Sequence, residues 1–296
     1  MVLDIPAAIG RRILEDRKSW DRNGKIYASD LASTTPNGPC LKSFWYQCKD
    51  SPKKDKTPGE GLMLMAGDRM HDLVAELLTK SQDELGAWEV EGVEDSVPMY
   101  VNGERVGQRL DILLRNAETG ERMVVDVKTK RGAAFNYMDE YADPGVTLQV
   151  QSYMMAVDAD YGAVLYVDRE GSNFMRMYPI KRDDDAVLRA YGALQVIRDA
   201  TFPPASLWLT CNIKQNKGPD SVYLKVPWQI QYCNLETCRC RADLPRRNPP
   251  RGIVAKINDD GVVSPTKVGK AWEKEVMTAL YAKYPNREFT LEGEEV

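Results

Sequence analysis

The spacing of apolar and polar positions predicts that helices and strands alternate along most of this chain. Apolar residues at helical spacing predict helices over 6–20, 62–78, 146–157 and 183–200, and an aromatic-rich segment predicts a short helix at 40–46. Runs with strand-like composition predict strands near 88–92, 96–101, 105–115, 122–128, 162–167 and 174–178. This order of elements indicates an α/β core built around a mixed sheet.

The last fifth of the chain differs in character from the rest. Pro245, Pro249 and Pro250, with flanking arginines, indicate a linker or an extended arm. A closing helix is predicted over 265–284. We therefore expect a main domain over residues 1–242 and a C-terminal extension of unknown role over 243–296.

Two of the predicted strands carry a group of charged residues. Asp126 and Lys128 alternate along a strand and so share one face, while Val127 points to the other. The segment 116–122 is polar and contains Gly120, which is typical of a hairpin loop that brings Asp111 beside Asp126. Two carboxylates and an ammonium on one side of a sheet can hold a divalent cation and orient a water for attack on phosphate. Taken alone, an Asp-x-Lys triplet is more often a surface ion pair.

Composition narrows the class of protein without identifying a partner. The net charge of −4 does not indicate a nucleic-acid binder, but a metal-dependent phosphodiesterase needs acidic ligands and binds its polyanion through local basic patches. Basic residues gather at 49–56 and 239–251, where solvated loops are an equal explanation. We find neither a secretory signal nor an apolar run near the roughly 20 residues that span a bilayer, so a cytoplasmic protein without membrane contact is expected.

The six cysteines are distributed unevenly. Cys40 and Cys48 lie near the start, Cys211 stands alone, and the other three are close together at Cys233, Cys238 and Cys240. Structural disulfides are rare in the cytoplasm. A cluster of three with a distant fourth instead indicates a metal or iron–sulfur site.

Two further features gain meaning only from their order. His71 is the single histidine of the chain and lies on the predicted helix before the strands. Gln149 and Tyr153 are one helical turn apart, so their side chains can hydrogen-bond and pack against a nucleic acid. Each feature alone is more often an ordinary helix residue.

Taken together, the motifs resemble the RecB-like branch of the PD-(D/E)xK nuclease superfamily. The resemblance covers about residues 26–240 and consists of Gly67-x3-His71, Asp111, Asp126-x-Lys128 and Gln149-x3-Tyr153, in that order. One cysteine before this set and three after it look like the Cas4-type members, which carry a [4Fe–4S] cluster, and their phage-encoded relatives. The implied fold is a restriction-endonuclease-like α/β core, with a mixed central sheet flanked by helices and closed by the cluster.

The resemblance also implies roles for individual residues. His71, Asp111 and Asp126 would bind Mg²⁺ or Mn²⁺, together with the backbone carbonyl of Val127. An imidazole ligand favours Mn²⁺. The implied catalytic residues are Lys128, Asp126 and Asp111, with Lys128 activating or positioning the attacking water. The implied DNA-binding residues are Gln149 and Tyr153.

The cysteine spacing departs from the family pattern. Family members usually place the last three cysteines as Cys-x2-Cys-x5-Cys, whereas this chain has Cys-x4-Cys-x-Cys. The expected iron–sulfur ligands are Cys40, Cys233, Cys238 and Cys240. Cys48 or Cys211 in place of one of them, and Zn²⁺ in place of the cluster, remain open. Closing a loop of roughly two hundred residues in this way would stabilise the folded state.

The expected function is that of a metal-dependent DNA exonuclease that prefers single-stranded ends, with endonuclease activity and cleavage polarity left open. The alternative is a non-catalytic iron–sulfur protein that binds nucleic acid or acts as an adaptor. An iron–sulfur protein with a coincidental Asp-x-Lys triplet must explain the order of all these motifs as coincidence and is disfavoured. Expected partners are DNA, a second copy of the chain, and recombination or CRISPR proteins.

Overall fold

The computed structural model describes residues 5–16, 24–35, 38–49, 57–136, 138, 140–171, 175–204, 210–225, 229 and 252–293. The chain divides into two compact units, Met1–Pro203 and Pro204–Val296. The first unit contains every described motif residue except Cys211. No described helix has the length and apolar character needed to cross a membrane.

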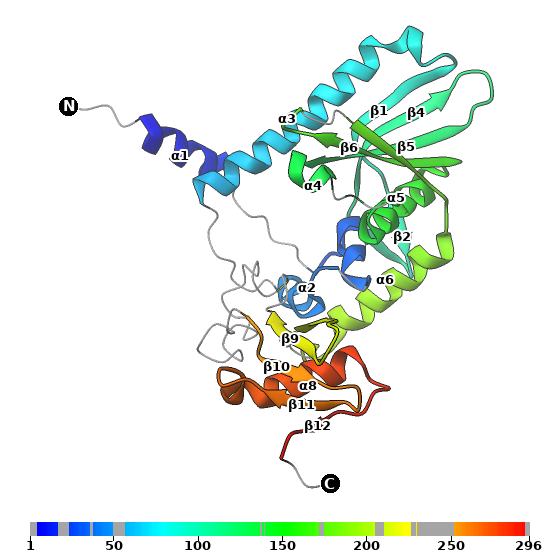
Figure 1. Cartoon of the computed structure of the whole chain (residues 1–296). Coiled ribbons are helices and arrows are strands. Elements are labelled where there is room, and N and C mark those ends of the chain that lie inside the picture. The colour runs from blue at the N-terminus through cyan, green and yellow to red at the C-terminus, as the bar shows by residue number, and fades with distance from the viewer. Residues whose placement is uncertain are drawn as a thin grey trace. The chain divides into compact units, whose positions relative to one another are not determined.

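A five-stranded mixed sheet forms the centre of the first unit (Figure 1). Its order is β1 (Trp88–Ser96), β4 (Arg109–Asn116), β5 (Arg122–Lys130), β6 (Tyr161–Asp168) and β7 (Met175–Ile180). The β5–β6 pair is parallel and the other neighbours are antiparallel. The predicted α/β core with a mixed sheet is therefore confirmed.

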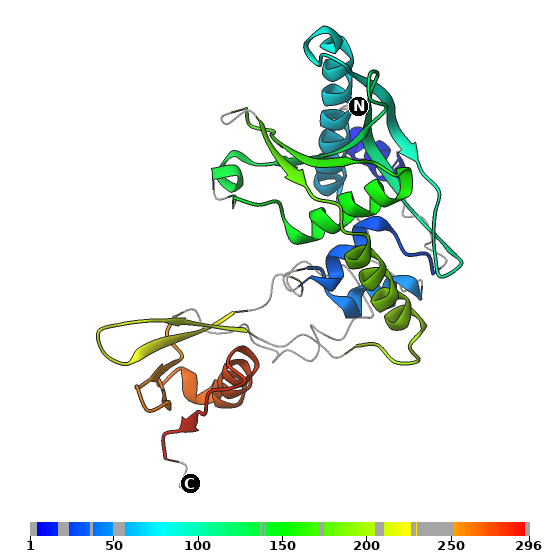
Figure 2. The ribbon, with the colours of Figure 1, turned by 90° about the vertical axis from the view of Figure 1, so that its right-hand side faces the viewer.

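Helices cover both faces of this sheet (Figures 1 and 2). On one face, Val74 and Ala75 of α3 (Pro58–Lys80) pack with the apolar side chains of β5. On the other face, Val150 and Met154 of α5 (Pro144–Val157) pack against Val124. Because both faces are buried, β5 reads as a nearly continuous apolar run instead of an alternating one. The short helix α4 (Gly132–Asn136) follows β5, and α1 (Ile5–Asp16) packs on α3.

A second layer of the first unit packs around α6 (Asp184–Asp199). It contains η1 (Ala28–Thr34), α2 (Leu41–Cys48) and the hairpin of β2 (Met99–Val101) with β3 (Glu104–Val106). The short helix η2 (Gln82–Glu84) joins α3 to β1.

The strand predicted over 105–115 is divided into β3 and β4. At the break, the Gly107 N–H donates to the Ile26 carbonyl at 2.9 Å, and its carbonyl accepts from Ala28 at 3.0 Å. This pairing with a distant segment takes the place of the continuous ladder that the local pattern predicted.

The second unit has its own sheet and its own core. The sheet order is β12 (Thr290–Leu291), β11 (Val262–Pro265), β10 (Ala255–Ile257), β9 (Asp220–Lys225) and β8 (Thr210–Lys214). Val276 and Leu280 of α8 (Glu273–Lys283) share a core with Val222 of β9 and with Trp272 of η3 (Gly269–Trp272). The closing helix predicted over 265–284 thus corresponds to η3 and α8.

The unit boundary lies earlier than the one expected between 242 and 243. Ala255–Ile257 pair with Asp220–Val222, so a strand from before residue 242 belongs to the C-terminal sheet. Residues 242 and 243 themselves lie outside the described part of the chain.

The separate cores predict that the two units respond separately to core mutations. Leu280 is fully buried, so Leu280→Ala should cost about 2–5 kcal/mol. Hydrogen exchange measured by mass spectrometry should accelerate over 255–291 and stay unchanged over 109–130. Val124→Ala is the matched control and should give the reverse pattern; acceleration of both regions by either variant would contradict two separate cores.

Candidate active site

The β4–β5 hairpin positions the two aspartates predicted from the sequence. Ile112 lies opposite Val125, and this register continued by one residue places Asp111 opposite Asp126. The Asp111 carboxylate reaches across to the neighbouring strand, where its Oδ2 accepts a hydrogen bond from the Val127 N–H at 2.7 Å. The predicted hairpin is therefore confirmed. The metal-binding role of the Val127 carbonyl stays a prediction.

The buried Asp126 forms an ion pair with the partly exposed Lys128 on β5. Lys128 Nζ donates to Asp126 Oδ1 at 2.9 Å and lies 2.7 Å from Oδ2. Both carboxylate oxygens therefore lie beside the ammonium, and Oδ2 is buried. Burial raises the pKa of Asp126 to about 6, with the Lys128 charge opposing that rise.

A second cluster forms where α3 passes the end of β1 and the start of β4. His71 precedes Val74 and Ala75 by about one turn, so the packing of those residues on the sheet directs His71 toward the same surface. His71 Nδ1 lies 3.5 Å from Asp111 Oδ2 and 3.8 Å from Glu94 Oε1. One ligand atom from each of these three residues lies within 4.8 Å of the other two.

Glu94 is the member of this cluster that the sequence did not predict. It lies on β1 beyond a register shift between Val90 and Gly92, and it has a left-handed backbone with φ of 55°. A non-glycine residue in this conformation costs about 1–3 kcal/mol, which the surrounding sheet must offset. Its only sequence signal was an acidic residue close to a glycine inside a strand, which is typical of a bulge.

The pKa values of the two carboxylates in this cluster shift in opposite directions. Burial disfavours the charged form of Asp111, but the contact with the His71 imidazole and the charge of Lys128 outweigh it and lower the Asp111 pKa. The same contact raises the pKa of His71. Burial raises the pKa of Glu94 despite its ion pair with Arg109, in which Nε and Oε2 are 2.7 Å apart.

The donor set suits a divalent cation. Two carboxylates and an imidazole converge, and oxygen ligands with one nitrogen fit Mg²⁺ or Mn²⁺. Glu94 Oε1 faces His71, whereas its Oε2 is held by the Arg109 guanidinium, so Oε1 is the oxygen that can bind a cation. Asp126 is not one of these three converging residues, and its carboxylate pairs with Lys128.

Gln149 and Tyr153 lie on one face of α5, as their spacing predicts. Gln149 Nε2 donates to the Tyr153 hydroxyl at 2.6 Å. Tyr153 is only 3% exposed, and burial raises the pKa of its hydroxyl, with the charges of Asp126 and Asp111 adding to the rise. The tyrosine ring therefore packs in the core, and Gln149 is the member of the pair that a substrate can reach.

The structure describes only part of the predicted iron–sulfur site. Cys40 precedes α2 and is partly exposed, whereas Cys48 at the end of α2 is buried in the core. Cys211 lies on β8. The remaining predicted ligands, Cys233, Cys238 and Cys240, lie outside the described residues, so the iron–sulfur cluster stays a prediction.

Comparison with known proteins yields distant structural similarities. No family model matches the chain, and no curated protein matches its sequence. SSO0001 has 19% identity, a TM-score of 0.44, and coverage of 77% of this chain and 93% of its own. The alkaline exonuclease LHK-Exo from Laribacter hongkongensis has 12% identity, a TM-score of 0.41, and coverage of 63% and 89%. A phage-related exonuclease from Haemophilus somnus 129PT has 12% identity, a TM-score of 0.40, and coverage of 58% and 90%. Similarities this low do not define the activity of this chain.

The single histidine allows a direct test of the site's geometry. In the metal-free protein, the His71 pKa should exceed 6.5 because the Asp111 carboxylate stabilises the imidazolium. Asp111→Asn removes that charge, so the His71 pKa should fall. An NMR titration of the imidazole resonance measures both values.

The matched control is Asp72→Asn, which neutralises the carboxylate next to His71 in sequence; that carboxylate pairs with Arg69. This variant should titrate close to wild type. An unchanged His71 pKa in Asp111→Asn would show that the two side chains do not interact.

Proposed function

We propose that this chain is a nuclease that hydrolyses phosphodiester bonds of DNA with the help of a divalent cation. One observation carries the proposal: His71, Glu94 and Asp111 converge beside the Asp126–Lys128 ion pair. Oxygen and imidazole donors next to a lysine ammonium are suited to a phosphate diester, because they combine cation binding with a positive charge from the protein.

The residues that would hold Mg²⁺ or Mn²⁺ are His71, Asp111 and Glu94, with Asp126 and the Val127 carbonyl added by the family resemblance. When bound, the cation would neutralise charge on the phosphate and lower the pKa of a water. An imidazole in the ligand set favours Mn²⁺.

We assign to Lys128 the role of orienting the attacking water. Its ammonium is oriented by Asp126 and its side chain is 28% exposed, so it can reach both the buried carboxylate and a substrate. There it would orient the water and offset negative charge that develops on the phosphate. Gln149 would contact the DNA, and Tyr153 would fix the orientation of Gln149 through their hydrogen bond.

The finer assignment is an exonuclease that prefers single-stranded DNA ends, and the family resemblance supports it. Endonuclease activity, cleavage polarity and assembly with a second copy or with recombination or CRISPR proteins depend on the same resemblance. The alternative, a non-catalytic binding or adaptor protein, would leave the convergence of acidic ligands at Lys128 without a role.

We also propose a [4Fe–4S] cluster held by Cys40, Cys233, Cys238 and Cys240. The cysteine order supports it, and so does the difference between the two N-terminal cysteines. Cys40 is partly exposed, whereas Cys48 is only 6% exposed and packs with Phe44 in the core.

The nuclease assignment predicts a cation-dependent activity that Lys128→Ala removes. Loss of the positive charge at the reacting phosphate should lower the cleavage rate by about a hundredfold or more. The measurement is cleavage of end-labelled single- and double-stranded DNA with Mn²⁺, Mg²⁺ or EDTA. The released products also show the polarity of cleavage.

Lys80→Ala is the control, since Lys80 lies at the end of α3 and pairs with the exposed Glu76. It should cleave at the wild-type rate. Equal rates in wild type and Lys128→Ala would exclude this site. DNA binding without cleavage by the folded wild-type protein would favour the adaptor alternative.

The cluster assignment predicts different results for the two N-terminal cysteines. Anaerobically purified Cys40→Ser should lose iron and the visible absorbance of the cluster, and it should melt at a lower temperature because ligand bonds contribute to folding. Cys48→Ala should retain both metal and absorbance. Full iron content in Cys40→Ser would remove Cys40 from the ligand set, and zinc in the wild-type protein would replace the cluster with a zinc site.

A further inference from the structure

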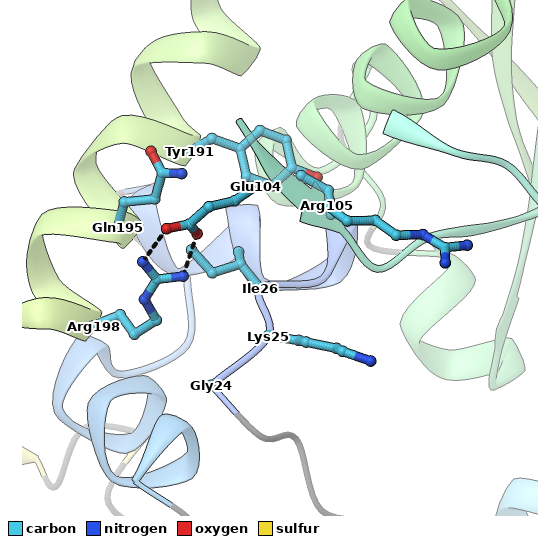
Figure 3. Close-up of a pocket in the computed structure, with 9 residues that line it drawn as sticks. Gly24, Lys25, Ile26, Glu104, Arg105, Tyr191, Gln195 and Arg198 are labelled. Carbon is cyan, nitrogen blue, oxygen red and sulfur yellow. Dashed lines mark hydrogen bonds and ion pairs between the residues drawn. The ribbon is translucent and has the colours of Figure 1, made fainter. Parts of the chain in front are cut away.

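A basic hollow runs alongside β3 and the start of β4 in the first unit. It has a volume of about 440 Å³, and a smaller neighbouring hollow, drawn in Figure 3, shares Lys25, Arg105 and Val106 with it. We call the larger one the hairpin groove. The residues of its lining that carry the argument are Lys25, Tyr27, Arg105, Gln108 and Arg109.

The lining of the hairpin groove is positively charged although the whole chain is acidic. Three of its residues are basic and none of its described residues is acidic. Within the described part of the chain, neither Lys25 nor Arg105 forms an ion pair, and both side chains are exposed. Their charges are therefore available to an anionic ligand.

On the opposite side of β3, the charge of Arg198 is neutralised by acidic side chains. Glu104 accepts hydrogen bonds from Arg198, one of them at 2.8 Å, and Arg198 also pairs with Asp199. Adjacent residues of a strand point in opposite directions, so Arg105 points away from this cluster. Figure 3 shows Lys25 and Arg105 extending to the same side, away from the Glu104–Arg198 pair.

The groove also contains an aromatic ring and a buried amide. The Tyr27 ring lies against Gly107, where an added Cβ would come within 2.6 Å of it, so the glycine makes room for the ring. Gln108 is only 9% exposed; its Oε1 accepts a hydrogen bond from Ser152, while its Nε2 has no acceptor among the described residues. An acceptor supplied by a ligand would satisfy this donor.

The groove reaches the candidate active site through Arg109. Arg109 belongs to the groove lining, and its guanidinium pairs with Glu94, which belongs to the cluster with His71. Asp111 follows two residues later on the same strand, about 7 Å further along. A ligand that follows the groove along β4 therefore ends beside the carboxylates.

We propose that the hairpin groove binds the sugar–phosphate backbone of the DNA strand that is cut, on one side of the cleaved bond. This inference rests on the proposed function. Lys25 and Arg105 contact phosphates, and the Tyr27 ring packs against a base or sugar. A basic track interleaved with an aromatic side chain is how proteins hold single strands without reading their sequence.

The test is binding of a short fluorescent oligothymidylate to the full chain by anisotropy, in EDTA so that no cleavage occurs, over a range of salt concentrations. Replacing both cations, as Lys25→Gln with Arg105→Gln, should weaken binding by about tenfold or more. The slope of log affinity against log salt should flatten by about 1.4, since each phosphate contact on a single strand contributes about 0.7. Arg105→Lys keeps the charge and should keep the slope.

Arg115→Gln is the matched control, because Arg115 is an exposed cation on the same strand, six residues or about 20 Å from Arg109. It should bind like wild type. Wild-type affinity and slope in the double variant, with melting curves confirming that it is folded, would overturn the proposal, and so would a wild-type protein that does not bind the oligonucleotide.

The binding assay separates this inference from the proposed function. If binding depends on Lys25 and Arg105 but the wild type does not cleave with Mn²⁺ or Mg²⁺, the binding role of the groove is supported and the nuclease assignment is wrong. If the wild type cleaves, and the double variant cleaves and binds equally well, the nuclease assignment is supported and the binding role of the groove is wrong.

Discussion

The antiparallel register of β4 against β5 is the constraint on which the candidate active site depends. Apolar residues fill both faces of this pair, packing under α3 on one side and under α5 on the other. A shift of one residue would turn every side chain of one strand to the opposite face and disrupt the packing under both helices, so this packing holds the register. That register sets Asp111 opposite Asp126 and brings the Val127 N–H to the Asp111 carboxylate.

Burial also gives the acidic groups of the site different pKa shifts. Desolvation raises the pKa of Asp126 and of Glu94, whereas Asp111 is held ionised by His71 and Lys128. A divalent cation would favour the charged form of every carboxylate near it. The protein thus keeps several anionic ligands close together only by combining them with cations, either its own or a bound one.

The distribution of charge matters more here than its sum. An acidic chain can bind a polyanion if its carboxylates gather at a cation site and its free cations line the approach to that site. In this molecule the ion pair of Glu94 with Arg109 joins the acidic cluster of the candidate active site to the basic hairpin groove. On one side of β3, Glu104 pairs with Arg198 of α6. On the other side, Arg105 is exposed.

Features that depend on local backbone geometry could be predicted from the sequence. Strand alternation placed Asp126 with Lys128, and periodicity located the helices on both faces of the sheet. Only the tertiary structure brought in Glu94, because a register shift and a left-handed backbone remove it from the alternation of its strand. It also broke the predicted strand at Gly107 through pairing beside Tyr27, a segment about eighty residues away, and it placed β9 in the C-terminal sheet. Local periodicity cannot report such contacts, because they are decided by which distant surfaces pack together.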